Sequence, residues 1–86
     1  MTYALEITAL AERRLRKLFR EPQQRLRDGI EELADSPRPL GCRKLSGYHD
    51  VYRIRVGSYR VIYSVDDERV IVLIIKLGHR RAVYRR

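Results

Sequence analysis

The chain of 86 residues has one cysteine, two histidines and no tryptophan, and its longest apolar run, 70–75, is short. The single Cys42 excludes an internal disulfide and cannot open a zinc-ligand pair of the usual spacing. The apolar run is far too short to span a membrane, and the N-terminus lacks the basic and apolar stretches of a secretory signal. We therefore expect a cytoplasmic protein with no structural metal and no cofactor.

Acidic residues are scarce in the second half of the chain. Residues 1–37 carry seven basic and seven acidic side chains, whereas residues 38–86 carry twelve basic and four acidic ones, so the formal net charge of +8 arises entirely there. The length and the hydrophobic fraction of 44% predict one small folded domain over 1–86. A surplus confined to one segment indicates a face that binds a polyanion.

The N-terminal part of the chain predicts one strand and two helices. Residues 3–7 alternate between apolar and other side chains, as in a strand with one buried face. Apolar residues recur at helical spacing over 9–20 and again over 22–34. Thr8 suits the N-cap of the first helix, while Pro22 ends that helix at the preceding residue and suits the first turn of the second. The short break predicts an antiparallel helical hairpin.

The rest of the chain is typical of strands. Alternating residues over 51–56 and 59–65, separated by a Gly-Ser pair, predict a β-hairpin with a two-residue turn. Residues 70–75 are apolar on both sides, as in a central strand, and we expect Gly78 to break it. The predicted fold is α+β, β-α-α-β-β-β along the chain: a mostly antiparallel four-stranded sheet with the N-terminal helical hairpin packed on one face.

The two-residue turn determines which side chains face one another across the hairpin. It places Arg55 opposite Arg60 and Arg53 opposite Ile62, with all three arginines on the sheet face away from the helices. One arginine on such a face is commonly just solvated. Three that converge with almost no acid nearby indicate phosphate binding, because a guanidinium offers fixed donors matched to phosphate oxygens.

The C-terminal segment 78–86 adds further cations. His79, Arg80 and Arg81 are expected to approach the same face as the three arginines. A segment of this composition is by default a frayed basic end. Tyr84 argues against that reading, because an aromatic among arginines can stack on a base or supply a hydroxyl.

Three segments together carry a family resemblance: 44–47 (KLSG), 51–63 (VYRIRVGSYRVIY) and 77–84 (LGHRRAVY). They resemble the RelE/ParE superfamily of bacterial toxin–antitoxin toxins, and most closely its RelE branch. The resemblance implies a ribosome-dependent endoribonuclease, an mRNA interferase, that cleaves mRNA in the ribosomal A site and inhibits translation. It also implies a cognate RelB-like antitoxin that holds the toxin inactive in a hetero-oligomer.

The resemblance extends to individual residues. The family's functional positions fall on Arg53, Arg55, Arg60, His79, Arg80 and Tyr84. The sequence departs from the family in two ways. RelE toxins tend to have lysines at positions 53 and 55, and the segment before the tyrosine is shorter here, so that Arg80 and Arg81 compete for one role.

Metal-independent cleavage of RNA by in-line attack of the 2′-OH needs a base, an acid and cations for the phosphoryl oxygens. We assign Arg60 and Arg80 to the scissile phosphate, and His79 with Tyr84 to proton transfer. Further RNA contacts are assigned to Arg53, Arg55, Lys44 and Arg81. Arginine cannot serve as a general base, so few side chains remain that could carry a proton. Among them, His49 is a weaker candidate for proton transfer than His79.

Two other functions fit the same composition. A ParE-like toxin of this fold inhibits DNA gyrase without catalysis, and a basic module binds RNA through its phosphates alone. The combination of arginines and a tyrosine favours RNA cleavage over both.

Overall fold

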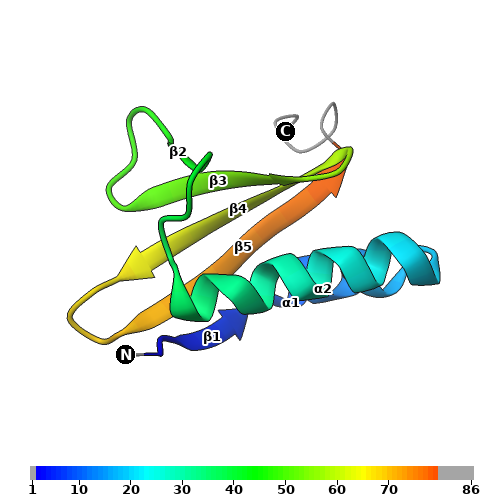
Figure 1. The fold of residues 1–86 in the computed structure, drawn as a ribbon, viewed down its shortest axis with the longest axis horizontal. Coiled ribbons are helices and arrows are strands. Elements are labelled where there is room, and N and C mark those ends of the chain that lie inside the picture. Colours follow the sequence, from blue (N-terminus) through cyan, green and yellow to red (C-terminus); the bar gives the residue numbers. More distant parts are fainter. Residues whose placement is uncertain (1, 80–86) are drawn as a thin grey trace.

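The computed structural model describes residues 2–79, which form two helices and five strands (Figure 1). The elements are β1 (Ala4–Ile7), α1 (Ala9–Arg16), α2 (Arg20–Asp35), β2 (Arg43–Lys44), β3 (Val51–Val56), β4 (Tyr59–Asp66) and β5 (Ile71–His79). The sheet has the order β1-β5-β4-β3-β2, and only β1 and β5 pair in parallel. This confirms the α+β class and the mostly antiparallel sheet. No helix among the described residues is long and apolar enough to cross a membrane.

Both helices cover the same face of the sheet (Figure 1). The turn between α1 and α2, the β3–β4 turn and the end of β5 lie at one end of the molecule, on the right in that view. The N-terminus and the β4–β5 turn lie at the other end. The face of the sheet away from the helices is called the open face below.

The helical hairpin begins where it was predicted to begin but reverses earlier. Thr8 caps α1 by accepting a hydrogen bond from Ala11 N, and its hydroxyl donates to Ile75 O of β5 at 2.7 Å. The prediction that the first helix continues to residue 20 is wrong. Its last turn tightens at Lys17, whose N–H donates to Arg14 O, and α2 already begins at Arg20. Pro22 lies inside that first turn, where no N–H is needed.

The strands agree with the predicted register and differ at two places. The observed pairs include Arg55 with Arg60 and Arg53 with Ile62, as the two-residue turn requires. The short strand β2 is additional to the four expected, because two residues are too few to show alternation. Gly78 does not break its strand: it pairs with Arg60, and β5 continues to His79. A glycine weakens a strand without ending it when a neighbouring strand supplies its hydrogen bonds.

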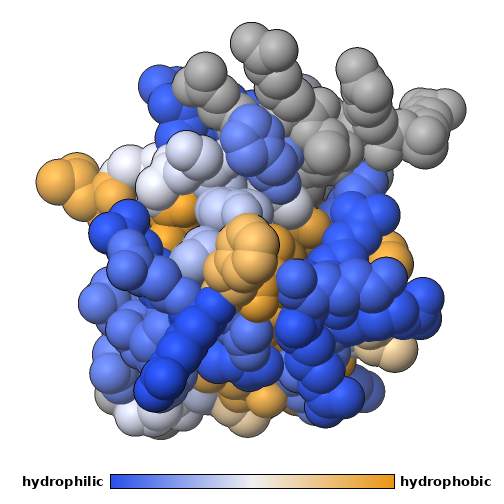
Figure 2. Space-filling model, turned by 90° about the vertical axis from the view of Figure 1, so that its right-hand side faces the viewer, coloured by the Kyte–Doolittle hydropathy of each residue, from blue (hydrophilic) through white to orange (hydrophobic). Residues whose placement is uncertain are grey.

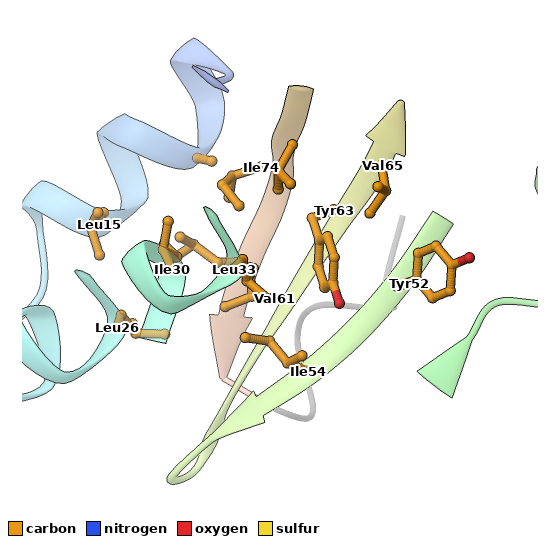
Figure 3. Packing of buried hydrophobic residues seen from close by; sticks show 13 residues of the cluster. Leu15, Leu26, Ile30, Leu33, Tyr52, Ile54, Val61, Tyr63, Val65 and Ile74 are labelled. Carbon is orange, nitrogen blue, oxygen red and sulfur yellow. The ribbon is translucent and has the colours of Figure 1, made fainter. Parts of the chain in front are cut away.

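The core fills the space between the helices and the inner face of the sheet (Figure 3). Leu15 of α1 and Leu26 of α2 meet Val61 and Tyr63 of β4, and all four side chains are fully buried. Gly29 lets α2 approach β3, because a Cβ at that position would lie only 3.0 Å from Val56 Cγ2. The helices therefore cover the inner face of the sheet closely and leave the open face uncovered by helices.

Candidate nucleic-acid interface

The register gathers five cations on the open face. Arg43 is paired with Arg53, and Arg55 with Arg60. Lys76 of β5 lies on the same face, because it is paired with Ile62, which is two residues after Arg60 on β4. The acids that share this face, Glu6 and Asp66, lie on the far strand β1 and at the opposite end of β4. The sheet thus concentrates positive charge where β2, β3 and β4 run side by side.

The three predicted arginines differ in their exposure to solvent. Arg55 is exposed and Arg60 is half-buried, with its Nε atom inaccessible. Arg53 is only 8% exposed, although it lies on the face that the sequence predicted to be solvated. The described residues supply no hydrogen bond or ion pair to Arg53. Burying a guanidinium without a partner is unfavourable, so Arg53 is the cation that gains most from an arriving anion.

The register separates one predicted site residue from the open-face cations and adds two that were not predicted. Lys44 is paired with Tyr52, on the side of the sheet that faces the helices, so it does not join the open-face cations. Arg43, its neighbour, does. Lys76 was also missed, because the β-bulge between Ile62 and Tyr63 shifts the register of β5 in a way that the sequence does not reveal.

His79 lies at the end of β5 and is paired with Tyr59. Their rings meet edge to face with centroids 6.0 Å apart, and the register places both on the side opposite to Arg60. The expectation that His79 approaches the arginine face is therefore wrong for this conformation, because it relied on a break at Gly78. The other predicted residues of this segment, Arg80, Arg81 and Tyr84, lie outside the described residues.

A separate polar network occupies the other end of the molecule. Arg38 donates two hydrogen bonds to Asp67, at 3.2 and 2.8 Å, and a third from Nε to the Tyr52 hydroxyl at 2.9 Å. Tyr3 donates to the same carboxylate at 2.7 Å. The hydrogen bonds from Arg38 and, to a smaller extent, the one from Tyr3 hold the pKa of Asp67 below its ordinary value. Asp67 is thus committed to Arg38 and lies away from the open-face cations.

The aromatic rings beside this network serve the fold. Tyr52 and Tyr63 stack with centroids 5.8 Å apart (Figure 3), and the Tyr63 hydroxyl donates to Pro37 O at 2.7 Å. Burial raises the pKa of Tyr63, so its hydroxyl stays protonated.

The weaker candidate His49 lies in the loop before β3. Its Nε2 atom is 3.1 Å from Asp50 Oδ2, and its side chain is almost fully exposed. These groups therefore lie apart from the open-face arginines.

The chain matches one family model and several characterised proteins. Residues 5–84 match the model of the ParE toxin of type II toxin–antitoxin systems. The mRNA interferase toxin RelE of Escherichia coli is 37% identical over 93% of this chain and 85% of its own length. Toxin RelG of Mycobacterium tuberculosis is 34% identical, with both chains covered completely.

Solved structures agree with these matches. The fold is similar to that in the archaeal RelE–RelB complex of Pyrococcus horikoshii, with a TM-score of 0.84 and 33% identity over 96% of this chain and all of that one. It is also similar to that in the intact RelBE toxin–antitoxin complex of E. coli, with a TM-score of 0.79 and 35% identity over 90% and 95% of the two chains.

Proposed function

This chain belongs to the family of RelE and ParE toxins of type II toxin–antitoxin systems, and from that premise we propose that it is an mRNA interferase. In this proposal it cleaves mRNA in the A site of the translating ribosome, in the cytoplasm, and a RelB-like antitoxin holds it inactive. The named activity of the E. coli relative and the RelE–RelB complexes among its structural neighbours support both parts.

The observation that carries the proposal is the arginine set on the open face. Arg55 and Arg60 face each other across β3 and β4, and Arg53 lies buried beside them with no acid from the described residues. Each guanidinium presents planar donors that match phosphate oxygens. A polyanion relieves the mutual repulsion of these cations, and a phosphodiester backbone supplies the repeated anions that such a face requires.

The chemistry we propose is in-line attack of the 2′-OH on the adjacent phosphorus, without a metal ion. Arg60, together with Arg80, stabilises the charge that develops on the phosphoryl oxygens. Arg53 and Arg55 position the RNA backbone, with Arg43 and Lys76 as further contacts in place of Lys44. Arg81 adds an RNA contact from the segment beyond the described residues.

Proton transfer is assigned to Tyr84 and His79. The imidazole of His79 has to leave its contact with Tyr59 to reach the open face. The open-face arginines do not carry protons, so the site has few groups for acid–base catalysis. In this proposal the ribosome compensates by orienting the 2′-OH for attack.

Cleavage on translating ribosomes tests the proposal. Arg60→Ala is expected to slow mRNA cleavage about 10²–10³-fold, the loss typical of removing one donor to a developing oxyanion. Tyr84→Phe tests the proton-transfer role in the same assay. Arg69→Ala is the matched control, because it removes one exposed cation from the β4–β5 turn. Cleavage at the wild-type rate by both Arg60→Ala and Tyr84→Phe contradicts the assignment.

The family model supports a second candidate function. Its description names ParE, and it matches nearly the whole chain. A ParE-like protein of this fold inhibits DNA gyrase without cleaving RNA. A supercoiling assay separates the two: inhibition of gyrase while mRNA stays intact favours this candidate and excludes the interferase.

A further inference from the structure

A second group of cations lies where the helical hairpin reverses. Around this turn, the acids are engaged by other arginines: Glu12 by Arg16 and Arg27, and Glu21 by Arg25. Within the described residues, the remaining cations form no ion pair and are all exposed; they are Arg13, Arg14, Lys17 and Arg20. The turn therefore carries positive charge that the fold does not neutralise.

The fold explains only part of this charge. Arg13 and Arg14 lie in the last turn of α1, where cations interact favourably with the helix dipole. Arg20 is the first residue of α2, where the same dipole disfavours a cation. Arg20 is thus in a position that helix stability alone does not select.

Phe19 is equally unexplained by folding. It is the only phenylalanine of the chain, and with 87% of its surface exposed it is not part of the core cluster. It also occupies the N-cap position of α2 without a side-chain cap, where serine, threonine or aspartate is favoured. An exposed aromatic ring flanked by Lys17 and Arg20 combines the two features with which proteins hold unpaired nucleotides, a stacking platform and cations for the phosphates.

This turn adjoins the open face around the end of the molecule. The Arg25 guanidinium lies beside the β3–β4 turn, since a Cβ built on Gly57 would be 4.0 Å from Arg25 Nη1. Viewed from this end, the surface is mostly hydrophilic with an apolar patch near its centre (Figure 2). The β3–β4 turn lies immediately after Arg55 and before Arg60. The contact between Arg25 of α2 and the β3–β4 turn therefore brings the helical hairpin close to the strands that carry Arg55 and Arg60.

We propose that the hairpin tip, defined as Lys17, Phe19 and Arg20, binds an unpaired nucleotide of RNA. The base stacks on the Phe19 ring, and the flanking phosphates lie against the two cations. The inference rests on the proposed function, which makes RNA the polyanion at this end of the protein. Phe19 is the one large apolar side chain of the two helices that is mostly exposed, since Leu10 is only 40% exposed. A single projecting ring suits a base, whereas a protein partner or a membrane needs a wider apolar patch.

The natural absence of tryptophan provides a direct probe, because F19W introduces the only indole of the chain. We expect a saturable quenching of its fluorescence by a single-stranded RNA of about eight nucleotides, within the usual site size. The RNA is 2′-O-methylated throughout so that the full-length protein binds it without cleaving it. Heparin, which carries anions without bases, is expected to leave the fluorescence unchanged.

Three results of this experiment overturn the proposal. Unchanged fluorescence while anisotropy shows that the RNA is bound places the RNA elsewhere. Equal quenching by heparin shows that no base is stacked. A blue shift with vesicles of phosphatidylglycerol, in the absence of quenching by RNA, identifies a membrane contact instead.

Affinity measurements give the independent check. Phe19→Ala is expected to weaken binding of the same RNA by roughly 5- to 150-fold, the effect of losing one stacked base. Leu40→Ala is the matched control, because Leu40 is also apolar and exposed but lies in the loop between α2 and β2. Equal affinity of Phe19→Ala and wild type overturns the proposal.

The same variants separate this inference from the proposed function. If Phe19→Ala binds as tightly as wild type while Arg60→Ala slows cleavage on ribosomes as expected, only the hairpin-tip site fails. If F19W is quenched by RNA while the wild-type protein leaves mRNA on translating ribosomes intact, the tip stands and the proposed function fails.

Discussion

Arg38 and Arg53 both lie against the sheet, but Arg38 is exposed and Arg53 is buried, and their surroundings are opposite. Arg38 donates to Asp67 and to the Tyr52 hydroxyl, so its charge is neutralised and its donors are used. Arg53 has no such partner among the described residues and lies between Arg43 and Ile62 in the sheet register. The first arginine ties a loop to the sheet, whereas the second holds a charge that no acid of residues 2–79 neutralises.

Charges that stabilise the fold and charges proposed to bind RNA lie at opposite ends of this sheet. At the β4–β5 end, Arg38 is matched by Asp67, and this pair stabilises the fold. At the β3–β4 end, Arg55 is paired with Arg60 in the register, and Arg53 is buried without a partner among the described residues. Like charges in paired positions and a buried cation without a partner both lower stability. Substitutions at the two ends are therefore expected to change different observables.

Arg38→Met removes the centre of the matched network. We expect it to lower the free energy of unfolding by about 1–2 kcal/mol, because three partly exposed hydrogen bonds are lost. RNA affinity is expected to stay within error of wild type. Urea unfolding and anisotropy on the same preparations check both values, and a loss of RNA affinity without a loss of stability would reverse the roles given to the two ends.

Arg55→Gln removes one exposed cation from the unmatched end. We expect the dependence of log affinity on log salt to become shallower by about 0.7, the contribution of one neutralised phosphate on single-stranded RNA. Arg69→Gln, at the β4–β5 turn, is the control and is expected to leave the slope unchanged. Equal slopes for Arg55→Gln and wild type show that Arg55 does not contact the backbone.

Asp67→Asn tests the Arg38–Asp67 pair through the pH dependence of stability, and its effect on the free energy of unfolding is expected to be the smallest of the three. The lowered pKa of Asp67 means that its charge stabilises the fold above the unfolded pKa of about 4. This stabilisation is lost as the pH falls through the lower folded pKa. The variant is therefore expected to lose less stability than wild type between about pH 6 and about pH 3. Parallel losses in urea unfolding show that the carboxylate adds nothing.

The sequence was sufficient for the features that depend on local geometry. A two-residue turn and strict alternation determine the pairing of Arg55 with Arg60, and Thr8 marks the start of α1 by its capping chemistry. The same alternation correctly separated the arginine face from the core face. The position of the arginine set could therefore be predicted without coordinates.

The features that the sequence did not reveal depend on neighbours distant in the chain. The burial of Arg53 requires knowing that β2 pairs beside it, and a two-residue strand leaves no periodic signal. The position of His79 depends on β4 continuing to support β5 past Gly78. The first helix ends at Arg16 and the second begins at Arg20, whereas Pro22 alone suggested a later break.

The most direct test of the account is Arg53→Met, with RNA binding and urea unfolding measured on the same protein. Methionine fills a similar volume without a charge that needs a partner. We predict that RNA affinity falls while the free energy of unfolding stays equal to wild type or rises by about 1 kcal/mol. A marked loss of stability, or unchanged RNA affinity, contradicts the claim that Arg53 is held for an external phosphate.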